Sequence, residues 1–530
     1  MPSTHSLSET LTYFKDRRLL SVFFFGISSG FPWVMIGSAM SGWLTDEGLS
    51  RSSIGLFGLI FVAYSINFLW SPLVDRLKIP FLTLKMGQRR SWIIFSQLII
   101  IFGGLNLSQL DVNHQLSLMA LYGLTIAIAG ATQDIAIDAY RIDSLSDKDS
   151  NYMAAGSAMA TAGWWTGYAG LGSIPFILVD QPNWQWPQIY LILSMIIALL
   201  MLTAFIVKEP KNQREQEHKL IEDNYLQVLP SQGKKPLAIL LILPLIILSI
   251  VYANIGYPGW PEHFISPEKQ FTFISIFVIS LLIIFTKQLS ALNSAVKNIS
   301  IKTDLKHKNN ILNRLTAWLL TTLAAPIHEF FQRNGTKLAI SILLFIFLFK
   351  LGEAYLGRMS IVFYREVGFS NADIAYYSKM INWGVTIVFS LIGSVFTIRY
   401  GILKGLFIGG IAMASSNLLF AALALVGPDK ALFAFTVFVD GFTSAWGTVA
   451  FVSLLSVLCN KTFSASQYAL MASLGTFGRV ILGSYSGIMV DWLDGNWALF
   501  FVLTSLMVIP SLVFLYMIRK PLTLLINKGN

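Results

Sequence analysis

Long apolar segments recur along the chain, and this feature limits the possible folds more than any other. A helix of about 20 apolar residues crosses the roughly 30 Å hydrocarbon core of a bilayer. We count fourteen segments of this type, separated by shorter polar stretches. They are residues 19–43, 54–74, 91–109, 117–140, 152–178, 186–207, 237–256, 271–289, 338–362, 371–398, 402–426, 431–458, 465–491 and 497–518. The sequence therefore predicts an all-α, polytopic membrane protein with fourteen transmembrane helices.

Composition supports this class and excludes others. Hydrophobic residues make up 55% of the chain and charged residues only 12%, which is more apolar than a soluble protein. The formal net charge is +10, but Lys and Arg lie in short stretches between apolar segments, so we expect membrane lipid and not nucleic acid as a partner. The single cysteine, Cys459, excludes an intrachain disulfide framework and a cysteine-cluster metal site. We expect no cofactor and no metal.

The basic residues predict the orientation of the helices. If the N-terminus is cytoplasmic, the inside stretches hold Lys15, Arg17, Arg18, Arg76, Lys78, Lys85, Arg89, Arg90, Lys208, Lys211, Arg214, Lys219, Lys234 and Lys235, with more in 290–337. The outside loops hold only Arg51, Lys269, Arg365 and Lys430. Cytoplasmic loops carry an excess of Lys and Arg, so both termini are expected in the cytoplasm.

The order of the segments predicts two six-helix halves. Residues 151–157 and 467–473 resemble each other weakly, and each begins a helix that is rich in small residues. Parallel repeats of this type resemble the major facilitator fold, which has its ligand site between the halves. We therefore expect a first bundle at 1–207, a cytoplasmic linker at 208–236, an inserted helix pair at 237–289, a cytoplasmic amphipathic segment at 290–337 and a second bundle at 338–530.

The segment between the inserted pair and the second bundle has a helical pattern of its own. Apolar residues recur at helical spacing after a basic tract at 297–308, namely at Leu312, Leu315, Leu319, Leu323, Ile327, Phe330 and Phe331. This pattern is typical of an amphipathic helix at a membrane surface. A loosely ordered tether is the alternative.

The most informative polar residues of the first half lie near the end of the apolar segment 117–140. Asp134 and Asp138 are four residues apart and Arg141 follows three later, so on a helix they share one face, next to Gln133. A carboxylate in hydrocarbon costs about 2.5–3.5 kcal/mol on insertion scales, and such groups usually face water or a partner charge. We expect this stripe to line a transport route, with Asp134 as proton carrier, Gln133 as a substrate contact, and Asp138 and Arg141 as gating residues.

The second half contains further ionisable residues inside its apolar segments. Lys350 and Glu353 can pair within one helix, which is the simplest structural explanation for these two. Lys379 and Arg479 have no acidic neighbour on their own segments, so they pair across helices with Asp440 or Glu353, or bind an anion. We expect Lys350, Lys379 and Arg479 to bind substrate, and Glu353 and Asp440 to take part in proton coupling.

A short motif follows the second apolar segment. Asp75 and Arg76 end it, and Gly87-Gln88-Arg89-Arg90 follows, which together resemble a signature that facilitators carry between their second and third helices. Asp75 is predicted to accept hydrogen bonds from the first turn of the 465–491 helix, which begins after Ser464, and to close one side of the protein. We assign Asp75 and Arg76 to gating. The alternative is a solvated turn that carries a charge pair.

Several blocks resemble the AmpG muropeptide permeases of Gram-negative bacteria. These blocks occur in order through both halves and include 26–32, 43–48, 68–76, 133–141, 326–334, 350–354 and 459–479. The resemblance implies a facilitator of the inner membrane that imports anhydromuropeptides, such as GlcNAc-anhydroMurNAc with its peptide, by symport with protons.

Two departures from this family affect the expected cargo. Members usually carry a lysine where this chain has Asn67, and an arginine where it has Trp165. Both positions are predicted to contact substrate, and Trp165 could stack on a sugar face. Loss of two cations favours a less anionic ligand.

We therefore expect a monomeric, proton-coupled importer of muropeptide-like small molecules that works by alternating access. The same fold could carry another cargo, such as an acyl-CoA or a siderophore. A membrane enzyme is disfavoured, because all six histidines lie outside the apolar segments at spacings that suit no metal pair. A sensor without transport stays open.

Overall fold

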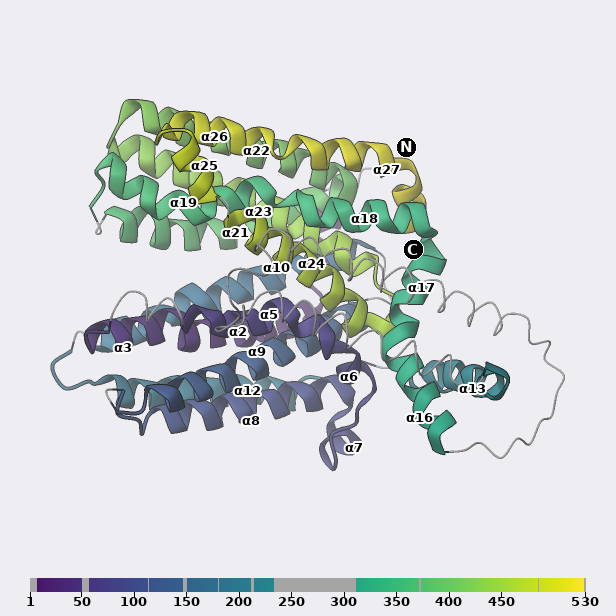
Figure 1. The fold of residues 1–530 in the computed structure, drawn as a ribbon. Helices are drawn as coiled ribbons and strands as arrows, with labels where there is room; N and C mark the ends of the chain where they lie inside the picture. Colours follow the sequence, from purple (N-terminus) through teal and green to yellow (C-terminus); the bar gives the residue numbers. More distant parts are fainter. Residues whose placement is uncertain are drawn as a thin grey trace, which may run out of the picture. The chain divides into compact units, whose positions relative to one another are not determined.

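The computed structural model describes residues 7–49, 57–112, 114–145, 150–179, 181–210, 214–232, 311–370, 373–484 and 486–528, and all of its regular elements are helical (Figure 1). The chain divides into two compact units, one of Met1–Asn212 with Asn334–Asn530 and one of Gln213–Arg333. The predicted inserted helix pair at 237–289 and the basic tract at 297–308 lie outside the described residues.

The first half of the larger unit consists of short and long helices in chain order. They are α1 (Leu7–Tyr13), α2 (Arg17–Gly30), the π-helical η1 (Val34–Ala39), α3 (Met40–Asp46), the 3₁₀ turn η2 (Gly58–Phe61), α5 (Val62–Ile66), η3 (Asn67–Leu69), α6 (Ser71–Arg76), α7 (Leu82–Met86), α8 (Gln88–Leu107), α9 (Leu116–Leu145), α10 (Ser150–Trp165), the π-helical η4 (Thr166–Gly170), η5 (Leu171–Ser173), α11 (Ile174–Val179) and α12 (Trp186–Ile206).

The second half of that unit repeats the pattern. Its elements are α18 (Thr336–Phe349), α19 (Leu351–Val367), the π-helical η7 (Ile374–Ile381), α21 (Asn382–Tyr400), α22 (Ile402–Val426), α23 (Lys430–Val457), η8 (Lys461–Phe463), α24 (Ser464–Ser484), α25 (Ser486–Trp492), α26 (Trp497–Leu506) and α27 (Ile509–Lys528).

The smaller unit contains the predicted amphipathic helix. Its described elements are α13 (Arg214–Gln232), α16 (Ile311–Leu319), the π-helical η6 (Leu320–Ala324) and α17 (Ala325–Asn334). The last three follow one another without a gap, so the helical pattern is confirmed and the loosely ordered tether is wrong for these residues. α16 packs against α13, where Tyr225 and Leu229 are buried. Its location at a membrane surface stays a prediction.

Nine helices among the described residues are long and apolar enough to cross a membrane, and each matches one predicted segment. The described parts of three further predicted segments, 54–74, 152–178 and 465–491, are helical but interrupted. In 54–74, for example, the helix restarts at Ser71 with Pro72 in its first turn, where the ring of proline fits and its missing N–H is not needed.

Equivalent contacts recur in the two halves and support a parallel repeat. At the end of α3, Asp46 accepts a hydrogen bond of 2.7 Å from the indole of Trp186, the first residue of α12. At the end of α19, Glu366 accepts one of 2.8 Å from the indole of Trp497, the first residue of α26. Each half thus ties its first long helix to its last in the same way.

Two helices make the main contacts between the halves. α10 of the first half contacts α21 and α23, and α24 of the second half contacts α6 and α9 (Figure 1). α10 also packs very closely against α2. A Cβ atom added at Gly163 would collide with the carbonyl oxygen of Phe23 and lie close to the Cα of Gly26. Glycine is required there for the two backbones to approach each other.

We expect Gly163→Ala to destabilise the protein by about 1–3 kcal/mol, because the added methyl group forces α2 and α10 apart. The measurement is the melting temperature of the detergent-solubilised protein. Gly384→Ala in α21 is the matched control, because nothing lies within 4 Å of a side chain at that position. Equal melting temperatures for the two variants would show that the approach of α2 to α10 is not tight.

Candidate functional site

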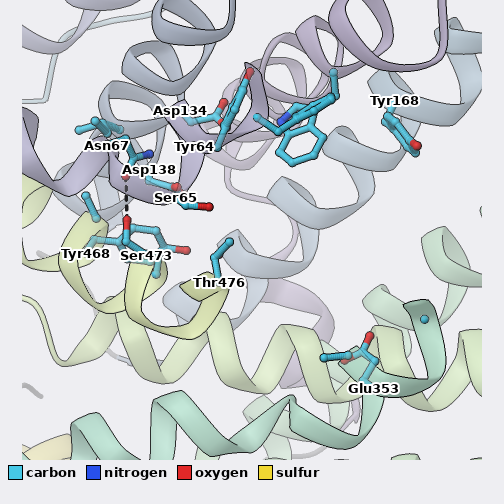
Figure 2. A pocket seen from close by; sticks show the side chains of 17 residues that line it. Tyr64, Ser65, Asn67, Asp134, Asp138, Tyr168, Glu353, Tyr468, Ser473 and Thr476 are labelled. Atoms are coloured by element: carbon cyan, nitrogen blue, oxygen red, sulfur yellow. Dashed lines mark hydrogen bonds between the residues drawn. The ribbon is translucent and has the colours of Figure 1, made fainter. Parts of the chain in front are cut away.

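One cavity between the two halves, which we call the aromatic cavity, has a volume of about 810 Å³. Its first-half wall is largely aromatic and also carries Asn67, Asp134 and Asp138. Its second-half wall carries Glu353 and, from α24, Tyr468, Ser473 and other residues. Figure 2 shows Asp134 and Asp138 on the first half and Glu353 on the facing element.

A second cavity, which we call the charged cavity, has a volume of about 540 Å³ and shares part of its wall with the first. The shared residues are Asp134, Asp138, Glu353, Gly357 and Tyr468. The sequence-predicted residues that line it are Asp134, Asp138, Arg141, Trp165, Lys350, Glu353 and Asp440. Side chains from both halves therefore meet at one place, although they are spread over some 300 residues of sequence.

The stripe on α9 faces this space. The hydroxyl of Ser29 donates a hydrogen bond of 2.6 Å to Asp134. Asp138 pairs with Arg141 at 2.9 Å on the same helix. The guanidinium of Arg141 also lies 5.1 Å from the ring centroid of Tyr468 on α24, so this side chain contacts both halves.

Lys350 lies at a break between α18 and α19, where the sequence predicts one continuous helix. Its ammonium group is 3.2 Å from Glu353 and donates a hydrogen bond of 2.7 Å to Thr448 on α23. The predicted pairing of Lys350 with Glu353 is therefore present. Glu353 also accepts from Ser444, and the carboxylate of Asp440 from Ser416.

The structure does not bring every candidate to the cavities. Gln133 is fully buried, donates to the carbonyl of Ser28, and lines neither cavity, so its predicted contact with substrate has no support in the geometry. Lys379 is in η7 and Arg479 is in α24, but both side chains lie outside what the structure describes. Asn67 lines the aromatic cavity and accepts a hydrogen bond of 2.9 Å from Ser473 across the halves.

A buried polar network joins the halves at the end of the bundle where α6 ends and α24 begins; we call it the interbundle cluster (Asp75, Arg89, Asp143, Ser464 and Ser466). Arg89 donates to Asp75 at 2.7 Å and to Asp143 at 2.9 Å, and all three side chains are at most 1% exposed. The Ser464 hydroxyl accepts from Arg89 and donates to Asp143.

The predicted contact of Asp75 with the first turn of the 465–491 helix is present. Its carboxylate accepts from the backbone N–H groups of Ala465, at 3.4 Å, and Ser466, at 2.9 Å, and from the Ser466 hydroxyl. The unpaired N–H groups at a helix N-terminus favour a carboxylate. The alternative of a solvated turn is wrong, because the Asp75 side chain is buried.

Sequence reasoning missed two members of this cluster. The gating role was assigned to Asp75 and Arg76, but the buried cation that pairs with Asp75 is Arg89, and Arg76 is only half-buried. The sequence analysis named Arg89 only as part of the motif. Asp143 was not selected, although it follows Arg141 by two residues on α9. Only the packing of α8 against α9 shows that these charges meet.

Comparison with known proteins agrees with this architecture. A family model described as Major Facilitator Superfamily matches residues 22–295. A relative named "Putative transporter AmpG 4" from Rickettsia felis is 28% identical over 511 residues, which cover 96% of this chain and 98% of that protein. The "Anhydromuropeptide permease" of Escherichia coli is 27% identical over 519 residues, which cover 97% of this chain and 82% of that protein.

A solved structure of the proton:xylose symporter XylE has the same fold. It superposes with a TM-score of 0.58 at 13% identity and covers 94% of both chains. The helical fold, the cavities between its halves and these relatives define a multi-pass membrane transporter and not an enzyme. The chain belongs to the Major Facilitator Superfamily. Its predicted resemblance to AmpG-type permeases is confirmed by the relatives named above.

Proposed function

We propose that this protein imports anhydromuropeptides, such as GlcNAc-anhydroMurNAc with its peptide, across the bacterial inner membrane together with protons. Two facts support this cargo. Relatives named for AmpG or anhydromuropeptide transport align over nearly the whole chain. The cavities between the halves combine aromatic rings with charges of both signs, which suits a ligand that has sugar rings and ionised groups.

The observation that carries the proposal is the gathering of Asp134, Glu353, Asp440, Arg141 and Lys350 around the charged cavity. Charged groups inside a membrane protein are rare and generally belong to a substrate or ion pathway. In our proposal, Asp134 carries the proton, and Glu353 and Asp440 adjust the charge around it.

Other residues hold the cargo. Lys350 binds its carboxylates from the helix break, and we assign Lys379 in η7 and Arg479 in α24 to the same role. Asn67 and Trp165 contact its uncharged parts.

The contacts between the halves support alternating access as the mechanism in this proposal. The interbundle cluster joins the halves at one end of the bundle, and a second contact between the halves, of Asp138 and Arg141 with Tyr468, lies at the wall of the charged cavity. We propose that this end faces the cytoplasm, that Asp75 and Arg76 belong to its gate, and that the protein acts as a monomer. Opening then requires α24 to separate from α6 and α9 so that the cargo can leave.

Uptake into proteoliposomes tests the cargo and the coupling together. With an inward proton gradient, purified protein is expected to accumulate labelled anhydromuropeptide, and a protonophore is expected to abolish the accumulation. Uptake that the protonophore leaves unchanged would contradict proton coupling. Because Asn67 and Trp165 stand where relatives carry cations, the competitors should include an acyl-CoA and a siderophore. Inhibition by one of these, but not by unlabelled anhydromuropeptide, would identify that compound as the cargo instead.

Thiol labelling tests the orientation. Lys78 and His114 are exposed at opposite ends of the first half, and Lys78 is at the end that carries the interbundle cluster. In a Cys459→Ser background, a membrane-impermeant maleimide is expected to label the His114→Cys variant in intact spheroplasts. The Lys78→Cys variant should react only after the membrane is permeabilised. The reverse pattern would place the termini outside.

A further inference from the structure

Five aromatic side chains of the first half contact one another in a continuous series, and none of them has been given a role of its own above. We call this series the aromatic patch (Trp33, Phe61, Tyr64, Trp164 and Tyr168). The ring centroid of Trp33 is 4.6 Å from that of Phe61 and 4.7 Å from that of Tyr64. Trp164 stacks on Tyr168 at 5.0 Å and is 6.0 Å from Trp33.

The backbone presents these rings to the cavities at irregular points of the helices. Trp33 lies between α2 and the π-helical η1, and Tyr168 is within the π-helical η4. π-Helical turns frequently accompany functional sites. Trp33 and Tyr168 line the aromatic cavity, whereas Trp164 lines the charged cavity, so the patch extends across the boundary between the two.

The second-half wall of the aromatic cavity includes several small residues beside Glu353 and Tyr468. Ala354 and Gly357 come from α19, and Ala472 comes from α24. Figure 2 shows Tyr64 and Tyr168 on the first half and Thr476 on α24. The aromatic rings together with these small side chains line a cavity of about 810 Å³, which is large enough to hold a sugar ring. The C–H face of a pyranose can stack there, while its hydroxyl groups reach polar side chains such as Ser65 and Asn67.

The cations that suit the carboxylates of a ligand lie at the charged cavity. Lys350 and Arg141 line the charged cavity and are absent from the wall of the aromatic cavity. We infer that the aromatic patch is a carbohydrate subsite that stacks on a pyranose ring, and that the charged cavity binds the ionised part of the same molecule. This assignment rests on the proposed cargo and adds its orientation: the sugar lies against the first half and the carboxylates point to Lys350.

Binding by isothermal titration calorimetry tests the assignment with three probes. These are an anhydromuropeptide, the neutral disaccharide N,N′-diacetylchitobiose and a free acidic tripeptide. Tyr168→Leu removes one stacking ring, Tyr168→Phe keeps it and serves as the matched control, and Lys350→Gln removes the cation. Each variant is first compared with the wild type by melting temperature, so that a loss of folding is recognised.

We expect Tyr168→Leu to weaken binding of the disaccharide and the anhydromuropeptide about tenfold and to leave the tripeptide unchanged. Tyr168→Phe should bind all three as the wild type does. Lys350→Gln should weaken the tripeptide and the anhydromuropeptide but not the disaccharide. Equal losses for sugar and peptide in Tyr168→Leu, or no loss for sugar, would overturn the subsite.

The same titrations separate this inference from the proposed function. If the wild type binds the disaccharide through Tyr168 but does not bind the anhydromuropeptide, the carbohydrate subsite stands and the proposed cargo fails. If the anhydromuropeptide binds the wild type and Tyr168→Leu equally well, the cargo stands and the subsite fails. A wild type that binds no probe overturns both.

Discussion

Arg89→Ala is expected to destabilise the protein by about 3–5 kcal/mol, because it leaves Asp75 and Asp143 buried without their shared cation. The two carboxylates would then repel each other in a site that water does not reach. The remaining partners of Asp75, the first turn of α24, compensate for only part of this charge. The expected observation is a large fall in the melting temperature of the solubilised protein and in its yield from membranes.

Two further variants make this result specific to the cluster. Arg365→Ala removes an exposed arginine of the second half, and its effect should stay within about 0.5 kcal/mol. A triple variant, Arg89→Met with Asp75→Asn and Asp143→Asn, removes all three charges and should recover much of the stability, because no uncompensated charge remains. If the Arg89→Ala and Arg365→Ala variants have the same melting temperature, the cluster does not hold the halves together.

The second large effect concerns transport. Asp134→Asn is expected to reduce gradient-driven accumulation of the cargo to the level of protein-free vesicles. Asparagine has nearly the same shape and still accepts the hydrogen bond of Ser29, but it cannot take up and release a proton. Exchange of labelled for unlabelled cargo at equilibrium does not require a net proton movement, so it should persist in this variant.

Conservative variants of other carboxylates serve as controls. Asp111→Asn alters an exposed residue between α8 and α9 and should transport normally. Glu353→Gln and Asp440→Asn alter the same cavity and should change the apparent affinity while accumulation still follows the gradient. If Asp134→Asn accumulates cargo and Glu353→Gln does not, the proton carrier is Glu353.

Properties that depend on a single helix could be predicted from the sequence. Nine of the fourteen predicted apolar segments correspond to long apolar helices in the part of the chain that the structure describes, since the length of a membrane helix follows from the thickness of the bilayer. The stripe of Asp134, Asp138 and Arg141 on α9 was also accessible, because helical periodicity alone sets which residues share a face.

Other features depend on how helices pack. The sequence analysis did not predict the break at Lys350 or the interruption near Asn67, although Pro72 at the start of α6 is a local signal for the second of these. Gln133 adjoins Asp134 in sequence, yet it packs against Ser28 on α2, because neighbouring residues of a helix point in different directions.

The sequence by itself determined that this chain is a helical membrane protein with ionisable side chains inside its helices, since bilayer thickness and hydrophobicity act on each segment separately. Only the tertiary structure decided which of these side chains meet. Asp75, Arg89, Asp143 and Ser464 come from four helices and form one network, and Asn67 pairs with Ser473. Such contacts depend on the rotation and crossing of helices far apart in the chain, which periodicity within one helix does not specify.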